Sequence, residues 1–475
     1  MNYKLIALIC ALCTGLPIIA ADTPGDSLLL SLDDCLRIAL TENPTVKVAD
    51  MEISRTDYSK KEVLSQLLPQ ASFDGSYSRT LAKQVMYMNM DFSMDDLLGG
   101  ATGDESSSSD QSRSESQSGG NSDGIKVGLD NSYSVGFSVA MPLIAPQLWA
   151  SLKLSDNQIL QAVENARASK LDLINNVKSA YYTLMLAYDS RRVIQESYDM
   201  AKFTHDMYSK QYEVGAASDY DVLRTSVAMK NIEPQLLQAD VAIKQARLQL
   251  LLLMGIESSQ PFKISGTLTD YEKTMYADVL SIDKDYSNNS SLILNDLQTD
   301  LLSKSLKVEK ASLYPTLAAS FNYNWTSMSN GSPIRNFRWT PYSMAGLQLS
   351  IPLFTGGKRY SRIKAAQIQL DEMKWTRMNL ERSVSMQVDL AVDNIKVNVE
   401  QIASCSESVG EASRAHDIME KSFAIGATSY LNLRDSELAL TQSRLAYYQA
   451  IYNYLVARSQ LELLLGNAPI DQYTK

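Results

Sequence analysis

The chain is an internal duplication, and this feature limits its fold more than any other. The stretch that begins at Asn43 aligns without a gap with the stretch that begins at Asn289, 246 residues later. Farther along, equivalent residues lie 210 and then 211 residues apart. The matched pairs include Asn43 with Asn289, Pro69 with Pro315, Tyr77 with Tyr323, Pro142 with Pro352, and Gly215 with Gly426. The two halves therefore share one plan of helix, strand, loop, strand, long helix, turn and helix.

The shared plan sets the expected boundaries. In the first repeat, residues 22–260, we expect a helix over 31–67, strands over 69–82 and 132–144, and long helices over 147–212 and 218–254. In the second repeat, residues 261–475, we expect a helix over 288–313, strands over 315–327 and 342–354, and long helices over 358–421 and 429–465. Ser, Gly and Asp dominate residues 95–125 of the first repeat, which predicts a disordered loop there.

The four strand candidates alternate between apolar and polar residues. In the first of them Phe73 and Tyr77 share one face, and Ser72 and Asp74 share the other. Alternation at period two over about 10 residues is typical of strands in a transmembrane β-barrel. It also fits a half-buried sheet in a soluble sandwich, so the pattern alone leaves both open. Very long helical stretches separate the four strands, and this favours the membrane, because a sandwich does not accommodate them.

Four strands are too few to close a barrel, because about eight is the practical minimum. Several copies of the chain must therefore pool their strands. Two copies would supply eight strands around an interior filled by side chains, and three copies would supply twelve strands around a lumen. Small polar residues on the inner face favour a pore.

The long helices predict a coiled coil. About 69 residues between Pro146 and Gly215 have helical periodicity, and they would span roughly 100 Å. Apolar residues within this stretch are spaced as in a coiled-coil seam, and the second repeat has the same spacing. The two seams are Leu173, Val177, Ala180, Leu184 and Tyr188, and Val384, Val388, Ala391, Ile395 and Val399. Each long helix is expected to reverse at Gly215 or Gly426, because glycine accepts the positive φ of a helix end.

The strand-to-helix transitions are assigned to Pro142, Pro352, Gly356 and Gly357. We expect each proline to end a strand at the point where the missing N–H matters little. The residues that follow should begin coiled-coil helices that run away from the membrane. The sequence thus changes from the two-residue period of a strand to the period of a helix where the chain is expected to leave lipid for water.

The N-terminus and the charge of the chain limit its location and partners. Lys4, an apolar run over 5–19 and small residues at 20 and 21 predict a secretory signal peptide over residues 1–21. No later run of 18 apolar residues occurs, so we expect the mature chain to meet a membrane only through strands. A formal net charge of -10 argues against a nucleic-acid partner. Cys35 and Cys405 form no disulfide framework and lack metal-ligand spacing.

Four stretches carry a resemblance to a known family. They are "SLDDCLRIALTENPTV" from Ser31, "IPLFTGGKR" from Ile351, "YEVGAASDYDVL" from Tyr212 and "FAIGATSYLNL" from Phe423. Through them the chain resembles the outer membrane efflux protein family, the TolC-like outer membrane factors, over nearly all of its mature length. The resemblance implies a mainly α fold with transmembrane β, in which a homotrimer forms a 12-stranded β-barrel continuous with a periplasmic α-helical coiled-coil barrel. It also implies the outer membrane of a Gram-negative bacterium and contact with outer membrane lipid.

The resemblance implies a function as well. Members of the family are exit ducts of tripartite efflux or type I secretion systems, and they work with a periplasmic adaptor protein and an inner membrane transporter. They carry no catalytic residues and no cofactor, and the sequence holds no phosphate loop, nucleophile elbow or zinc-spaced cluster. The alternative is a trimeric, membrane-anchored coiled-coil surface protein. Such a protein would hold its strands at one terminus, whereas here strands interrupt the helices twice, which favours the duct.

The resemblance further implies a gate and an adaptor-docking tip at the two helix turns. The residues assigned to this tip are Gly215, Asp221, Arg224, Gly426, Asn432 and Asp435. Asp435 matches an acidic position of the family, whereas Asn432 stands where a second acidic residue is usual. A trimer would therefore carry one ring of three carboxylates here, which would hold cations less tightly than two rings.

Two groups of residues are compatible with metal binding. His205 and His416 are repeat equivalents, and six imidazoles at one level of a trimer could sense pH or bind a metal. Simple inheritance through duplication also explains them, and we favour it. Met86, Met88 and Met90 could bind Cu(I) through their thioethers, but alternate Met residues also give a strand an apolar face, which we favour.

Overall fold

The computed structural model describes residues 28–86, 125–257, 262–272, 275, 284–330, 338–468 and 470–473. The chain divides into two compact units. The first unit takes its described residues from Met1–Tyr58, Ser155–Ser303 and Gln367–Lys475, and the second takes them from Ser59–Leu154 and Lys304–Ala366. Each unit therefore combines segments from both sequence repeats. The expected loop over 95–125 lies outside the described residues except for its last residue.

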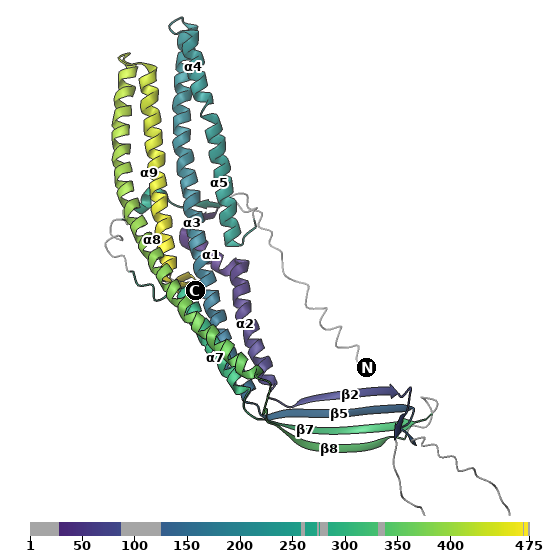
Figure 1. Cartoon of the computed structure of the whole chain (residues 1–475). Helices are drawn as coiled ribbons and strands as arrows, with labels where there is room; N and C mark the ends of the chain where they lie inside the picture. The colour runs from purple at the N-terminus through teal and green to yellow at the C-terminus, as the bar shows by residue number, and fades with distance from the viewer. Residues whose placement is uncertain are drawn as a thin grey trace, which may run out of the picture. The chain divides into compact units, whose positions relative to one another are not determined.

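The second unit is built on a four-stranded antiparallel sheet with the order β2-β5-β7-β8 (Figure 1). Its strands are β2 (Gln70–Arg79), β5 (Asn131–Ile144), β7 (Thr316–Ser329) and β8 (Thr340–Ser350). The two strands of each repeat are joined into one sheet by the pairing of β5 with β7. A separate antiparallel pair, β3 (Gln84–Met86) with β4 (Ile125–Val127), was not expected from the sequence.

The register gives the sheet one apolar face and one polar face. Phe73 lies opposite Phe137, which in turn lies opposite Tyr323, so three aromatic rings cross the sheet in one row. Polar or small residues alternate with them along most of each strand, and Met328, Tyr342 and Met344 are large side chains that share the polar face. The apolar face includes Phe73, Tyr77, Val135, Phe137, Val139, Phe321, Tyr323, Trp325, Leu347 and Leu349. The polar face includes Ser72, Asp74, Ser76, Ser134, Ser138, Ser320, Asn322, Asn324 and Gln348.

Two expectations about the strand ends are wrong. The strand expected over 342–354 ends at Ser350, because Ser350 pairs with Thr316, the first residue of β7, and no partner strand extends farther. Pro142 does not end its strand: β5 continues to Ile144 through an irregularity in its register with β7. Pro352 does lie beyond the end of β8.

The long helices begin just after these strands. Helix α3 (Pro146–Glu213) begins with a proline, whose missing N–H costs nothing at a helix start. Gly356 and Gly357 have φ values of 60° and 78° and precede α8 (Lys358–Ala424). Both long helices then run through the first unit. No helix within the described part of the chain combines the length and apolarity that a membrane span requires.

The first unit is helical. Its elements are α1 (Leu32–Glu42), α2 (Pro44–Ser65), α4 (Asp219–Lys230), α5 (Glu233–Met254), α7 (Ser290–Ala311), α9 (Tyr430–Leu465), α10 (Ile470–Tyr473), the 3-10 helix η1 (Leu268–Tyr271) and much of α3 and α8. The ends of α2 and α7 belong to the second unit. Strands β1 (Leu28–Leu30) and β6 (Phe262–Ile264) add a short parallel pair. In each seam predicted for α3 and α8 the first four residues are buried in one core, whereas Tyr188 is 37% exposed.

Two helices that we expected to be continuous are each broken in two. The helix expected over 31–67 stops at Asn43, whose extended ψ of 126° is the conformation favoured before a proline, and α2 begins at Pro44. The helix expected over 218–254 is interrupted at Asn231 and Ile232. Pro234, near the start of α5, has no N–H to donate and its ring would clash with the carbonyl four residues earlier.

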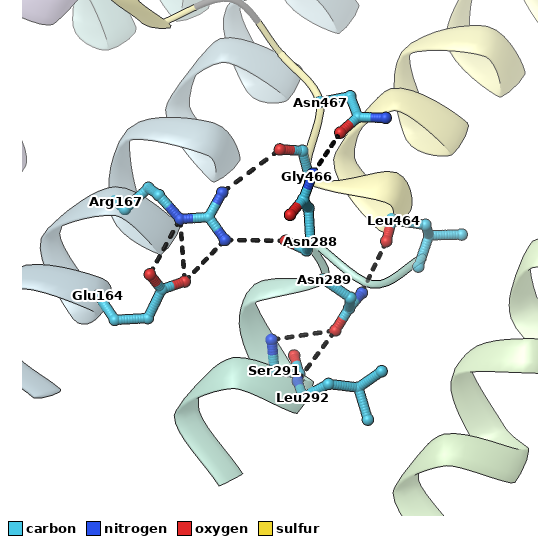
Figure 2. A network of polar contacts seen from close by, with 9 residues as sticks. All are labelled: Glu164, Arg167, Asn288, Asn289, Ser291, Leu292, Leu464, Gly466 and Asn467. Carbon is cyan, nitrogen blue, oxygen red and sulfur yellow. Dashed lines mark hydrogen bonds and ion pairs between the residues drawn. The ribbon is translucent and has the colours of Figure 1, made fainter. Parts of the chain in front are cut away.

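In both repeats an asparagine forms a junction between two helices. It links the end of the helix that follows the turn, α5 or α9, to the start of a shorter helix, α2 or α7. Asn289 accepts hydrogen bonds from the backbone N–H groups of Ser291 (3.0 Å) and Leu292 (3.2 Å), and its Nδ2 donates to the Leu464 carbonyl (2.7 Å) (Figure 2). One side chain thus caps the start of α7 and the end of α9. Asn43 does the same in the first repeat, bonding Thr45 and the Leu253 carbonyl, both at 2.7 Å.

An arginine reinforces only the second of these junctions. The Arg167 guanidinium donates to the Asn288 carbonyl (2.8 Å) and the Gly466 carbonyl (3.3 Å), while its Nε contacts Glu164 (Figure 2). A cation beside the last carbonyls of α9 also complements the helix dipole. The residue 211 positions later, which is the repeat equivalent of Arg167, is Met378. The duplication has therefore diverged at this point.

We predict that Gly466→Ala destabilises the protein. Gly466 ends α9 at φ +68°, and an added Cβ would lie 2.1 Å from the Asn288 carbonyl oxygen. The left-handed backbone alone costs a non-glycine residue about 1 kcal/mol or more. Thermal unfolding followed by circular dichroism should show a lower midpoint. Gly410→Ala is the matched control: Gly410 lies inside α8 with no atom within 4 Å of an added Cβ, and the change should stabilise by about 0.5–1 kcal/mol. Equal midpoints for the two variants would contradict the junction's role.

Candidate functional site

The two helical hairpins of the first unit end in turns of the same geometry. Gly215 and Gly426 have φ values of +77° and +75°. The Ala216 N–H bonds the Gln211 carbonyl at 2.7 Å, and the equivalent bond in the second turn is 2.8 Å. These bonds satisfy carbonyl groups that the end of each long helix leaves without a helical partner. The sequence therefore fixes a sharp reversal at each of the two predicted tip glycines.

A serine starts the returning helix after each turn. The Ser218 hydroxyl accepts from the Asp221 N–H at 3.2 Å, and the Asp221 carboxylate accepts from the Ser218 backbone N–H at 3.4 Å, which together form a capping box. The Ser429 hydroxyl likewise accepts from the Asn432 N–H (3.4 Å) at the start of α9, but Asn432 Nδ2 donates to the Thr428 hydroxyl (3.0 Å). Asp221 is thus engaged in starting α4, and Asn432 takes the equivalent place without a charge.

A cluster of aromatic and cationic side chains joins the two hairpins near their turns. We call Tyr208, Arg224, Phe423 and Tyr430 the tip cluster. The Arg224 guanidinium lies 5.1 Å from the centre of the Tyr430 ring, and Tyr208 lies 5.8 Å from Tyr430 and 6.4 Å from Phe423. A cation–π contact contributes about 0.5–2 kcal/mol, and an aromatic pair about 0.5–1.5 kcal/mol. The cluster therefore holds α3 and α4 against α8 and α9.

Of the predicted tip residues, only Arg224 takes part in this contact between hairpins. Asp435 is exposed on α9, and the two glycines stay in the turns. Sequence reasoning missed the three aromatic members of the cluster. The only signal available was the presence of Tyr or Phe within about ten residues of each tip glycine.

The two histidines bond hydroxyl groups within their own hairpins. His205 Nδ1 lies 3.2 Å from the Thr225 hydroxyl, and His416 Nδ1 lies 3.3 Å from the Ser436 hydroxyl. Each hydroxyl donates its own hydrogen to a backbone carbonyl, so each imidazole Nδ1 donates to the hydroxyl oxygen. Within the described ranges, no cluster of three or more His, Cys, Asp or Glu residues could hold a metal. Met88 and Met90 lie outside the described residues, and Met86 ends β3.

A buried carboxylate forms a second link between the hairpins. Glu437 on α9 is 7% exposed and accepts a hydrogen bond from the Ser197 hydroxyl on α3 at 3.0 Å. Burial raises the pKa of Glu437, although the Ser197 hydrogen bond and the nearby cationic Arg434 partly oppose this. Arg434 lies 3.6 Å from the carboxylate, and His416 is buried beside the same helix. The repeat equivalent of Glu437 is Ser226, so this link too is present only once.

The comparisons with known proteins identify the family. The model of the outer membrane efflux protein family matches residues 35–256 and 282–467. The chain belongs to the outer membrane efflux protein family. Outer membrane protein TolC of Escherichia coli (strain K12) is 24% identical over 364 residues, which cover 71% of this chain and 70% of the relative. The cobalt-zinc-cadmium resistance protein CzcC of Cupriavidus metallidurans is 23% identical over 298 residues, with coverage of 62% and 68%.

Solved structures show the same fold. The Campylobacter jejuni CmeC outer membrane channel has a TM-score of 0.67 at 15% identity, covering 93% of this chain and 88% of that one. CusC has a TM-score of 0.68 at 14% identity, with coverage of 92% and 93%. These findings confirm the predicted family, fold class and outer membrane location in a Gram-negative bacterium. This family member is an exit channel of the efflux and secretion type.

We predict that Glu437→Gln changes how stability depends on pH. Because the folded state raises the Glu437 pKa above its ordinary value of 4.5, protonation of Glu437 stabilises the fold fully below that pH. This stabilisation is lost as the pH rises through the raised pKa. The thermal unfolding midpoint of Glu437→Gln, measured as the difference from the wild-type midpoint, should therefore rise between pH 4 and about pH 8. Glu420→Gln, at an exposed site on α8, serves as the control. A constant difference across this range would contradict the prediction.

Proposed function

We propose that three copies of this chain form one continuous exit duct, in which their sheets join into a 12-stranded barrel. The observation that carries the proposal is the sheet order β2-β5-β7-β8, which leaves β2 and β8 as edges. Backbone N–H and C=O groups cannot remain unbonded in lipid, so a sheet with apolar residues on one face must close. Pairing β2 of one copy with β8 of the next closes a ring of three, and twelve strands are enough to leave a lumen.

Exposed apolar stripes on the long helices support the same assembly. On α8 the exposed large apolar residues fall within about 120° of one another at 100° per residue. They are Tyr360, Ile368, Trp375, Met378, Met386, Leu390, Val397 and Ile418. On α3 another set, Leu160, Val163, Tyr188 and Phe203, also shares one face. We propose that α8 of one copy packs against α3 of the next, a head-to-tail contact that closes into a ring.

The tip of the hairpins serves, in this proposal, as the gate and the docking site for a periplasmic adaptor. Gly215 and Gly426 set the turns, Asp221 and Asn432 start the returning helices, and Arg224 holds the two hairpins together. Asp435 is exposed and would supply one ring of three carboxylates. The adaptor connects the duct to an inner membrane transporter. We assign no catalytic step and no cofactor to the chain.

The relatives' names leave the cargo class open. They include cobalt-zinc-cadmium resistance, alkaline protease secretion and fusaric acid resistance. A duct of one design therefore occurs in systems of different chemistry, and we propose that the transporter makes the main choice of cargo.

The assembly and the conductance of the purified protein test the proposed function together. We expect native mass spectrometry of the detergent-purified protein to give three copies, and planar bilayers to show single channels of that species. A species of any other size, or a trimer that never conducts, would overturn the proposal. The second outcome would favour a membrane-anchored coiled-coil scaffold.

We predict that Arg224→Ala raises the open probability of single channels in planar bilayers. The change removes the cation–π contact with Tyr430, so the hairpins separate more readily, and at about 1 kcal/mol the open fraction should rise roughly fivefold. Tyr430→Leu should act in the same direction. Arg414→Ala is the matched control, because Arg414 is an exposed arginine on α8 that bonds only the Gly410 carbonyl in its own helix among the described residues. An unchanged open probability in both tip variants would remove the tip cluster from the gate.

A further inference from the structure

The polar face of the four-stranded sheet carries a single charged side chain. Within β2, β5, β7 and β8 as the structure describes them, the residues of this face are hydroxyl, amide or small side chains apart from Asp74, Pro142, Met328, Tyr342 and Met344. Arg79, at the end of β2, falls on the opposite face by the alternation of the strand. A carboxylate in this position is costly against lipid and favourable against water, which assigns the polar face to the aqueous side.

Asp74 belongs to a row that crosses the whole sheet. The register places Asp74 opposite Gly136, Gly136 opposite Asn324, and Asn324 opposite Tyr342. The Asn324 side chain leans over Gly136, because a Cβ added there would lie 1.8 Å from Asn324 Oδ1. Asn324 Nδ2 also donates to the Tyr342 hydroxyl at 3.2 Å. Two large side chains and one carboxylate therefore project at the same level of the polar face.

The Asp74 carboxylate is held by hydroxyl groups. The Ser72 hydroxyl donates to Asp74 Oδ2 at 2.8 Å and lies 2.6 Å from the Ser138 hydroxyl. Among the described residues, no basic side chain forms an ion pair with Asp74. Its negative charge is therefore oriented but not neutralised, and it remains exposed.

We propose that Asp74 sets the ion selectivity of the duct within its membrane-spanning part. This inference rests on the proposed trimer with the polar face inward. Three copies bring three Asp74 carboxylates to one level of the lumen, beside the Asn324 and Tyr342 side chains that narrow it. A ring of carboxylates lined by low-dielectric walls attracts cations and repels anions. The duct thus favours cationic and neutral cargo over small anionic cargo at this level, whichever transporter feeds it.

Reversal potentials across a KCl gradient in planar bilayers test the inference. Wild-type channels should prefer K+ over Cl-, and Asp74→Asn should lower the permeability ratio about twofold or more in dilute salt. The effect should fade toward 1 M KCl, because the Debye length falls from about 10 Å at 0.1 M to about 3 Å. Ser76→Asn, a neutral change on the same face of β2, should leave the ratio unchanged.

Charge replacement on one cysteine separates electrostatics from folding. In a Cys405→Ser background, Asp74→Cys treated with a negatively charged methanethiosulfonate should regain cation preference, and a positively charged reagent should reverse it. Phe73→Cys, on the apolar face, should not respond. Of the other native cysteines, Cys10 and Cys13 lie within the predicted signal peptide over residues 1–21. Cys35 is fully buried, and burial raises its pKa to about 12, so it should stay unreactive.

The outcomes distinguish the two claims. A wild-type protein that forms no channel would overturn the proposed function. A wild-type channel whose selectivity is the same in Asp74→Asn, and which ignores reagents at Asp74→Cys, would overturn the selectivity role and leave the proposed duct intact.

Discussion

The hydrogen-bonding groups at the edges of the sheet are the constraint on which the rest of the structure depends. Strands β2 and β8 each pair on one side only, and lipid offers their other sides no partner. A soluble protein could cover such edges with a loop or a charged residue. A membrane-spanning sheet with an apolar face can only continue into another copy. The chain supplies four strands, and in the proposed assembly three copies supply the twelve that leave room for a lumen.

The same duplication explains the helical unit and its asymmetries. Both repeats start a short helix with an asparagine that also bonds the end of a returning helix, and both hairpins turn at a glycine. Other contacts are made by residues that only one repeat has. Arg167 reinforces one junction, and Glu437 reaches from α9 to Ser197 on α3. Two equal hairpins would occupy equivalent positions in a ring of six, whereas these differences give each hairpin its own contacts.

Much of this arrangement could be predicted from the sequence, for a physical reason. The alternation of polar and apolar residues such as Ser72 and Phe73 predicts which face of a strand contacts water, because successive side chains point to opposite sides. The helix breaks at Asn43 and near Pro234 also had a local signal, because a proline lies at each of them. The apolar spacing continues across both prolines and predicts unbroken helices. For the tip cluster the sequence offered only Tyr or Phe near each tip glycine, with no sign of which side chains meet. Arg224 and Tyr430 are about two hundred residues apart, and only the packing of the hairpins brings them together. The row of Asp74, Asn324 and Tyr342 likewise needed the strand register.

Cross-linking between the edge strands tests the central claim most directly. In a Cys405→Ser background, Ser76→Cys on β2 would be combined in turn with Tyr342→Cys, Met344→Cys or Gly346→Cys on β8. Within one chain two strands separate these edges, a gap of roughly 14 Å, which no disulfide can bridge. Oxidation in native outer membranes should therefore give covalent products that stop at three chains for at least one pair. Products that stop at two chains, or a ladder that continues beyond three, would contradict the closed twelve-stranded duct.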